Sequence, residues 1–260
     1  MTVDDLALAA AAHDAAEDRL LGYASTAGVD VRRGAGWAAV RTGADSNDMN
    51  GVVSQDGAEI SPELIRDLMA WFGSVPASWL ARRPSARLTR KLLEAGALAE
   101  RSGRWSGRLL DGTRFDSRAA VEISRVRSVD DLDHWLDLAA ACGWVSSDQD
   151  RSARRQLYLG LGWDDALTQW LALDGPTPVG FASSYLHGHV LDLCNLGVLP
   201  ARRRQGIGRA LVAARLAAAA GRGATLLVSA PSPDGWRLQR TLGFRSVPVV
   251  ADRCFYLPLG

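Results

Sequence analysis

Helical spacing of apolar residues alternates with short apolar runs, and the two patterns predict the elements of the chain. Helices are expected where apolar residues recur on one face, in ranges 1–21, 61–73, 86–96, 129–143, 152–162, 206–220 and 235–244. Strands are expected between turn residues, in ranges 36–43, 50–57, 77–83, 103–112, 121–128, 167–200, 224–231 and 246–257. Range 167–200 holds three extended runs joined by turns, which indicates antiparallel neighbours. This order predicts an α+β fold with mixed, mostly antiparallel sheets and flanking helices.

A polar, turn-rich stretch, "DGTRFDSR" at 111–118, divides the chain into two parts. It predicts an N-terminal domain at 1–114 and a C-terminal domain at 119–260. Both parts close with a helix that ends at a glycine, Gly96 or Gly243, followed by a last strand. This weak internal likeness predicts a duplicated unit.

Composition places the chain among soluble globular proteins, with 47% hydrophobic and 23% charged residues and no apolar run long enough for a membrane span. A net charge of +1 gives no overall nucleic-acid footprint. Acidic residues at the front argue against a signal peptide, and three widely spaced cysteines argue against a disulfide framework or a metal site. We therefore expect a cytoplasmic protein without a metal. Lys91 is the only lysine, and a GC-rich coding bias explains most of the arginine excess.

The stretch "LPARRRQGIGRALVAARL" sets three arginines and two glycines before an alanine-rich helix. A strand that runs through glycines into a helix exposes backbone N–H groups at the positive end of the helix dipole, which favours a phosphate or pyrophosphate. No GK[ST] follows, as a nucleotide P-loop requires, and the third glycine of a Rossmann fingerprint is missing. The alternative is a tight helix start with a solvated basic face.

These residues resemble a known family. Val198 and Pro200, followed by Arg203, Gly206 and Gly208, are similar to motif A of the GCN5-related N-acetyltransferases (GNAT), V-x-P with R-x-x-G-x-G. The "LGF" at 242–244 is similar to the family's last-helix ending, so the resemblance covers about 121–260. The first half resembles a degenerate copy without the motif. The resemblance implies a tandem GNAT fold.

The resemblance further implies that acetyl-CoA, or another acyl-CoA, is the co-substrate. The splayed strand before the loop would pair its main chain with the pantetheine arm, and the loop amides would hold the pyrophosphate. The cofactor-binding residues implied are Leu196, Val198, Arg203, Arg204, Gln205, Gly206, Ile207, Gly208 and Arg209. The implied reaction transfers acetyl to a primary amine of a small molecule or peptide.

The proton carriers are open at this stage. Many family members donate a proton to the sulfur from a tyrosine at the position of Gln239, and glutamine cannot do so. Asp192 and Cys194 are candidate catalytic residues, although a carboxylate at Asp192 is about as often structural. His187 and His189 are further candidates, but a solvated turn explains them better. Alternatively, the thiolate leaves unassisted.

Residues 142–165 occupy the part of the chain where the family builds its acceptor pocket. Trp144 and Trp163 are candidates to line it, and Asp148 and Asp150 to bind a cationic acceptor. Core packing and a solvated loop are the competing interpretations.

Two other functions fit the same fold. One takes an aminoacyl group from charged tRNA, which an arginine-rich surface favours. The other is a non-catalytic acyl-CoA-binding module, which Gln239 favours. The degenerate half could replace a second subunit, so either a pseudo-dimeric monomer or a homodimer is expected.

Overall fold

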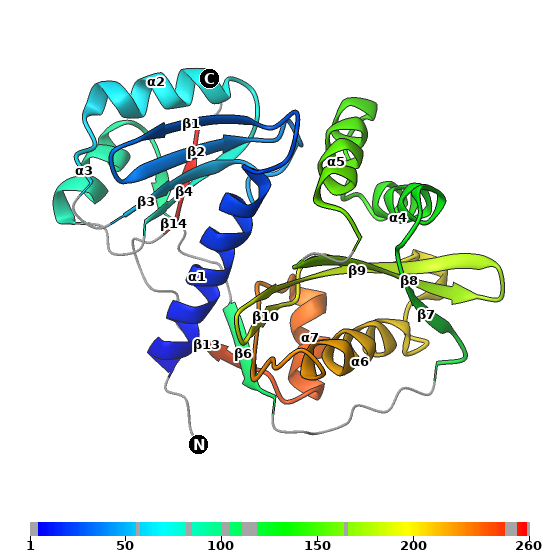
Figure 1. Ribbon diagram of the computed structural model, residues 1–260. Coiled ribbons are helices and arrows are strands. Elements are labelled where there is room, and N and C mark those ends of the chain that lie inside the picture. The colour runs from blue at the N-terminus through cyan, green and yellow to red at the C-terminus, as the bar shows by residue number, and fades with distance from the viewer. Residues whose placement is uncertain are drawn as a thin grey trace. The chain divides into compact units, whose positions relative to one another are not determined.

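The computed structural model describes residues 5–55, 58–81, 85–99, 105–110, 119–163, 166–247 and 254–258. They form two compact units that interleave along the chain (Figure 1). We call them the N-terminal unit, within 16–103, 148–160 and 249–260, and the C-terminal unit, within 1–15, 104–147 and 161–248. In the part of the chain described, no helix has the length and apolar character needed to cross a membrane.

The N-terminal unit is built on one sheet in the order β1-β2-β3-β4-β14-β5. Its strands are β1 (Asp30–Gly34), β2 (Trp37–Arg41), β3 (Gly51–Ser54), β4 (Ala77–Ala81), β5 (Leu98–Ala99) and β14 (Cys254–Leu257). Only β3 and β4 are parallel; the other neighbours are antiparallel. The core of this unit combines sheet residues such as Trp79 and Phe255 with apolar residues of two helices.

Those helices are α2 (Pro62–Phe72) and α3 (Ala86–Glu94), and the start of α2 confirms the sequence prediction. Ser61 caps α2 by accepting the N–H of Leu64 at 3.1 Å. Proline occupies the first position of α2, where its missing N–H costs nothing. At the other end, Gly73 adopts a φ of 60° and donates its N–H to Met69 at 3.1 Å. Glycine reaches that conformation without strain.

Two further helices contribute to the N-terminal unit: the second part of α1 (Asp5–Tyr23) and nearly all of α5 (Asp148–Leu161). In α5, Asp150 and Arg154 form a buried ion pair with Nε and Oδ1 2.8 Å apart. The same carboxylate accepts the backbone N–H of Asp45 at 2.8 Å. Asp150 is thus part of the core of this unit, and its carboxylate already has cationic and N–H partners.

The C-terminal unit is built on a sheet in the order β13-β6-β12-β10-β9-β8-β7, and β11 pairs with β9 beside it. Its strands are β6 (Trp105–Leu109), β7 (Glu122–Arg125), β8 (Leu167–Asp174), β9 (Thr177–His187), β10 (Val190–Asp192), β11 (Leu196–Val198), β12 (Leu226–Ser229) and β13 (Arg245–Val247). Only β10 and β12 are parallel. The predicted run of antiparallel strands in 167–200 is confirmed.

Helices cover both faces of this sheet. Helices α6 (Ile207–Ala220) and α7 (Pro233–Thr241) share one core with Leu191, Leu193 and Leu227. The first part of α1 packs over β6, where a Cβ on Gly107 would meet Leu8. Helix α4 (Val129–Ala141) carries Trp135, whose ring lies 4.9 Å from that of Phe181 in an edge-on contact. The next residue of β9, Ala182, packs in the core that contains residues of α6. Because neighbouring side chains of a strand point to opposite faces of the sheet, α4 and α6 lie on opposite faces.

The final strand that each half of the sequence contributes lies in the sheet of the other unit. Strand β6, at the end of the first half, pairs with β12 and β13 of the C-terminal unit. Strand β14, at the end of the chain, pairs with β4 and β5 of the N-terminal unit. In Figure 1, the red strand β14 lies among strands coloured blue to cyan.

With these strands exchanged, the two sheets share one topology. The orders β1-β2-β3-β4-β14-β5 and β8-β9-β10-β12-β6-β13 have the same relative direction at every neighbouring pair. The predicted α+β fold with mixed, mostly antiparallel sheets is confirmed, and two sheets are compatible with a tandem fold. Duplication and the domains at 1–114 and 119–260 stay predictions. The stretch 111–118, where that boundary falls, lies outside the described residues.

Candidate active site

The parallel strands of the C-terminal unit separate at Leu193. Strand β10 is paired with β12 up to the link between Asp192 and Val228. Leu193 then donates its N–H to the carbonyl of Val228 at 2.9 Å, and the chain bulges through Asn195, whose φ is 21°. Beyond the bulge, β11 pairs with β9, and no pairing with β12 occurs in the described residues. An open wedge of main chain results.

The open edge of β11 carries the main-chain groups of Leu196 and Val198. Asn195 and Leu199 direct hydrogen bonds to β9, through the carbonyl of Asn195 at 3.0 Å and the N–H of Leu199 at 3.1 Å. Because main-chain direction alternates along a strand, the groups of Leu196 and Val198 point the other way. These are the two residues predicted to contact a pantetheine arm; that role stays a prediction.

The wedge leads directly into the loop 199–206 and the start of α6. Residues Pro200–Arg202 form a single 3-10 turn, and Gly206 then caps α6 with a φ of 83°. Arg204 also has a positive φ, 67°, which is uncommon for a residue with a side chain. The N–H groups of Ile207 and Gly208 stand in the first turn of α6, where no acceptor exists within the helix. Exposed N–H groups of this kind favour an anion at the start of a helix.

Gly208 brings the loop close to neighbouring side chains. A Cβ on Gly208 would lie 3.2 Å from Cδ2 of Leu238 and 3.6 Å from Cδ2 of Leu196. The first of these distances is tighter than an ordinary contact, so a larger residue would have to displace Leu238. The glycine therefore keeps the first turn of α6 close to the strand β11.

The arginines of the loop have different tasks. Arg202 forms an ion pair with Asp174, which ties the 3-10 turn to the end of β8. Arg203 donates from Nε to the carbonyl of Val198 at 3.1 Å and is exposed. Arg204 is exposed. Arg203 and Arg204 therefore place positive charge at the rim of the helix start, and charge-assisted contacts from such groups strengthen phosphate binding.

Cys142 lies in the electrostatic field of Arg203. It is the C-terminal cap of α4 and is partly buried. Burial raises the pKa of the Cys142 thiol, and the charge and hydrogen bond of Arg203 oppose that rise. Sequence reasoning did not include this cysteine in the site, because 61 positions separate it from Arg203.

A buried hydrogen-bond network fills the apex of the wedge. Ser229, at the end of β12, donates from Oγ to the carbonyl of Leu193 at 3.0 Å. Gln239 of α7 donates from Nε2 to Ser229 Oγ at 2.9 Å, and its Oε1 accepts from the hydroxyl of Ser106 on β6. Gln239 is only 7% exposed. Gln239 is thus a buried amide with partners at both ends.

The candidate catalytic residues Asp192 and Cys194 lie on either side of Leu193. Asp192 is buried, and it points away from α6 and α7 because Leu191 and Leu193 face them. Cys194 is also buried and donates from Sγ to the carbonyl of Asp192 at 3.6 Å. The structure brings both residues to the bulge, and their catalytic roles stay predictions.

Arg215 of α6 stabilises the same bulge and was missed by sequence reasoning. It is fully buried and donates from Nη1 to the carbonyls of Ser183 at 2.7 Å and Cys194 at 3.0 Å. Burial lowers the pKa of Arg215 to about 10, while Cys194 and Asp192 favour the charged form. A charged residue among the alanines and leucines of the buried face of α6 was the available signal.

The residues proposed for the acceptor lie apart from this network. Trp144 is 42% exposed, and its ring lies edge-on to Phe181 at 6.4 Å. Trp163 is partly buried, and among the described residues no ring contact joins it to Trp144. His187 and His189 flank Gly188 in the turn between β9 and β10, as predicted. The described residues contain no group of three metal-ligating side chains.

Comparison with known proteins agrees with this geometry. The sequence profile of the Acetyltransferase (GNAT) family matches residues 130–244. No curated protein sequence matches the chain significantly.

Solved structures extend the likeness to most of the chain. A GCN5-related N-acetyltransferase from Kribbella flavida is 20% identical with a TM-score of 0.65, covering 96% of either chain. A conserved protein of unknown function from Staphylococcus epidermidis is 14% identical with a TM-score of 0.57, covering 88% of this chain and 92% of its own. At these identities the likeness shows the fold.

Proposed function

We propose that this chain, whose residues 130–244 match the sequence profile of the Acetyltransferase (GNAT) family, transfers acetyl from acetyl-CoA to a primary amine of a small molecule or peptide. The family supports an acyl-CoA-dependent N-acyltransferase in general terms. The wedge between β11 and β12, which opens onto the glycine start of α6, is the observation that carries the proposal.

Each part of the donor has a matching feature in the chain. The amides of Leu196 and Val198 at the open edge would pair with the pantetheine arm. The start of α6 would hold the pyrophosphate through the N–H groups of Ile207 and Gly208, with the flanking loop residues. Arg203 would move from the carbonyl of Val198 to a phosphate, which offers it a charged acceptor in place of a neutral one.

The chemical step forms one bond and breaks one. The neutral amine attacks the thioester carbonyl, the C–N bond forms, and the C–S bond breaks as thiolate leaves. The amine nitrogen gives its proton to a base, for which Asp192 stays the candidate. Gln239 supplies no proton, because a carboxamide is too weak an acid, and its amide is bonded to Ser106 and Ser229. Positioning of the two substrates would therefore contribute much of the acceleration.

Calorimetry with acetyl-CoA tests the donor, and the variant Gly208→Val is the sharpest probe. Its added side chain collides with Leu238 at the start of α6, so binding should fall by at least about tenfold. Gly221→Ala is the matched control, since Gly221 caps the far end of α6 with a φ of −64° and an added Cβ there would lie 3.7 Å from its nearest neighbour. Full-strength acetyl-CoA binding by Gly208→Val would contradict the proposed site, as would no binding by the unaltered protein.

Release of free CoA in the presence of amines tests the reaction. The engaged state of Gln239 also favours a non-catalytic acyl-CoA-binding module. Amine-dependent release of CoA, with formation of the acetylated amine, supports the enzyme. Tight binding of acetyl-CoA without release across a broad panel of amines and amino-terminal peptides favours the module. A charged-tRNA donor would instead show tRNA binding that weakens steeply with salt.

A further inference from the structure

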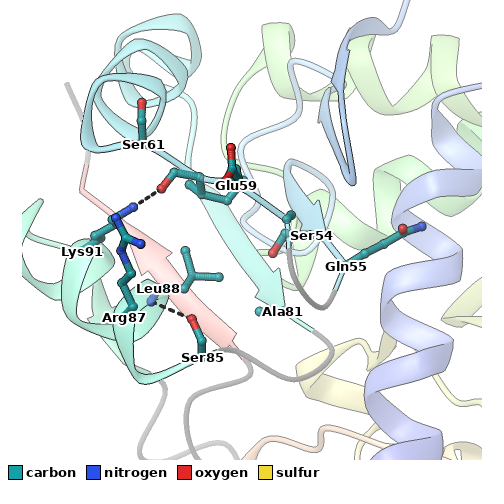
Figure 2. A pocket seen from close by; sticks show the side chains of 11 residues that line it. Ser54, Gln55, Glu59, Ser61, Ala81, Ser85, Arg87, Leu88 and Lys91 are labelled. Carbon is teal, nitrogen blue, oxygen red and sulfur yellow. Dashed lines mark hydrogen bonds between the residues drawn. The ribbon is translucent and has the colours of Figure 1, made fainter.

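The N-terminal unit contains an open cavity of about 510 Å³ (Figure 2). It lies where the parallel strands β3 and β4 end, at Ser54 and Ala81, and where α3 begins. Ligands of open α/β sheets commonly bind outside the carboxyl ends of parallel strands. The volume lies within the range of about 300–1,000 Å³ that small-molecule sites occupy.

Two positively charged side chains of α3 line the cavity. Arg87 and Lys91 both line it and are four positions apart, so they project from the same face of the helix (Figure 2). Lys91 donates from Nζ to the carbonyl of Ile60, a neutral acceptor that leaves its charge uncompensated. Among the described residues that line the cavity, Glu59 is the one acidic side chain, and it is exposed. The described lining side chains thus carry one more positive charge than negative charge.

The remaining lining is apolar, with hydroxyl groups. Ala58, Ile60, Ala81 and Leu88 provide the apolar surface. The hydroxyl of Ser54 is buried at the end of β3 and accepts the indole N–H of Trp79 at 2.9 Å. A hydroxyl that accepts this bond keeps its own hydrogen to donate. The cavity therefore combines an apolar wall with donors and a cationic pair.

The helix starts beside the cavity do not suit a pyrophosphate. Ser61 Oγ already accepts the N–H of Leu64 at 3.1 Å in α2, whose first residue, Pro62, has no N–H. Ser85 Oγ accepts the N–H of Leu88 at 3.1 Å in the same way at α3. The glycine start of α6 in the C-terminal unit has no such side-chain cap. The charge available here comes from two side chains and suits a single compact anionic group.

We propose that this cavity binds a small organic carboxylate with a short apolar body. Arg87 and Lys91 hold the carboxylate, and Ile60 and Leu88 contact the apolar part. The site is separate from the acyl-CoA site and does not depend on the proposed function.

Binding of hexanoate and benzoate to the full-length protein, measured by calorimetry and ligand-observed NMR, tests this site. We expect saturable binding with millimolar affinity, and no binding of the neutral analogues hexanamide and benzamide. Arg87→Gln and Lys91→Gln should each weaken binding by about tenfold, because each removes a charge-assisted contact. Arg90→Gln is the matched control, since Arg90 is on the same helix, is exposed and pairs with Glu94 at 3.9 Å.

A second control separates this site from the loop of α6. Arg203→Gln should leave carboxylate binding unchanged, whereas it should weaken acetyl-CoA. The proposal is overturned if neither carboxylate saturates up to about 20 mM, if binding is lost only in Arg203→Gln, or if inorganic phosphate binds as tightly as benzoate. Arg87 is exposed, so Arg87→Gln should keep the melting temperature of the unaltered protein. A loss of carboxylate binding in this variant can then be attributed to the lost charge and not to unfolding.

Discussion

Gln239 donates from Nε2 to Ser229 Oγ at 2.9 Å, and this bond joins α7 to the apex of the wedge between β11 and β12. Ser229 in turn donates from Oγ to the carbonyl of Leu193, where the parallel strands separate. Gln239 therefore acts on the shape of the wedge, and proton donation is not available to it. We therefore infer a positioning role for Gln239 in the candidate site, which its alanine variant tests.

Replacing Gln239 with alanine should lower the free energy of unfolding clearly, while it lowers the rate of turnover only slightly. The change removes one hydrogen bond from each of the buried hydroxyls of Ser106 and Ser229, and each lost hydrogen bond costs about 0.5–1.5 kcal/mol. The free energy of unfolding, measured with urea, should fall accordingly. Amine-dependent CoA release per folded molecule should fall by less than about tenfold.

Arg240→Ala is the matched control, because Arg240 is the next residue in α7 and is exposed. It should leave both quantities unchanged. A loss of turnover of about a thousandfold or more in Gln239→Ala, at unchanged stability, would contradict the positioning role.

The start of α6 and the partners of Gln239 show how far a sequence can predict this site. The spacing from Pro200 to Gly208 predicts a glycine start with arginines, because each residue type has a local physical task there. The hydroxyl of Ser106 is brought to Gln239 from 133 positions away. Contacts at that distance depend on strand pairing, which a local pattern does not encode.

Helix ends were predictable for the same local reason, and strand partners were not. The two ends of α2 can be predicted from capping and permitted φ angles alone, at Ser61, Pro62 and Gly73. The runs that became β6 and β14 read as strands from their apolar residues. Nothing in the composition of these two runs indicates that each strand pairs in the sheet of the other unit. The strands available as neighbours in the two sheets are alike.

Removing the charge of Arg203 should shift the reactivity of Cys142 to higher pH. Burial already raises the pKa of this thiol, and Arg203 opposes the rise by stabilising the thiolate. In Arg203→Gln, the pKa should therefore rise further, and the thiolate fraction at a given pH should fall. The rate of iodoacetamide labelling at Cys142, followed by mass spectrometry across pH, measures this.

Cys254 provides an internal reference in the N-terminal unit, and its pH profile should be the same in both proteins. Faster labelling of Cys142 at neutral pH in Arg203→Gln would show that the arginine shields the thiol and does not stabilise its anion.

Replacing Arg215 with methionine should destabilise the protein by about 3–5 kcal/mol, because it breaks a buried charge–charge interaction with Asp192. It also removes the donor to the carbonyls of Ser183 and Cys194. The double variant with Asp192→Asn should recover part of the loss, which a double-mutant cycle in urea measures. Additive losses would exclude the coupling.

The effect of Arg215 should not vary with pH near neutrality. Burial lowers the folded-state pKa of Arg215 to about 10, below that of the free group, so the residue is charged in both states at lower pH. Above about pH 10, the unfolded chain binds more protons than the folded one, and linkage makes the contribution to stability rise with pH. Between about pH 6 and pH 9, the difference between the unaltered protein and Arg215→Met should be flat.

Truncation after residue 248 should unfold the N-terminal unit, although the missing residues come last in the sequence. The deletion removes β14, which lies between β4 and β5 and buries Phe255 completely beside Trp79. Loss of a strand inside a sheet leaves two edges and opens the core. Hydrogen exchange should show protection lost in β3, β4 and α2, while β8, β9 and α6 keep theirs.

Phe255→Ala tests the same strand with a single side chain. Large buried aromatic residues cost about 3–5 kcal/mol when truncated to alanine, and the loss should appear in the N-terminal unit. Leu98→Ala on the neighbouring strand β5 is the control, since Leu98 is 68% exposed. A chain whose last strand stayed with its own half would show the opposite pattern, with β12 and β13 deprotected by the truncation and α2 unaffected. That pattern would refute the strand exchange.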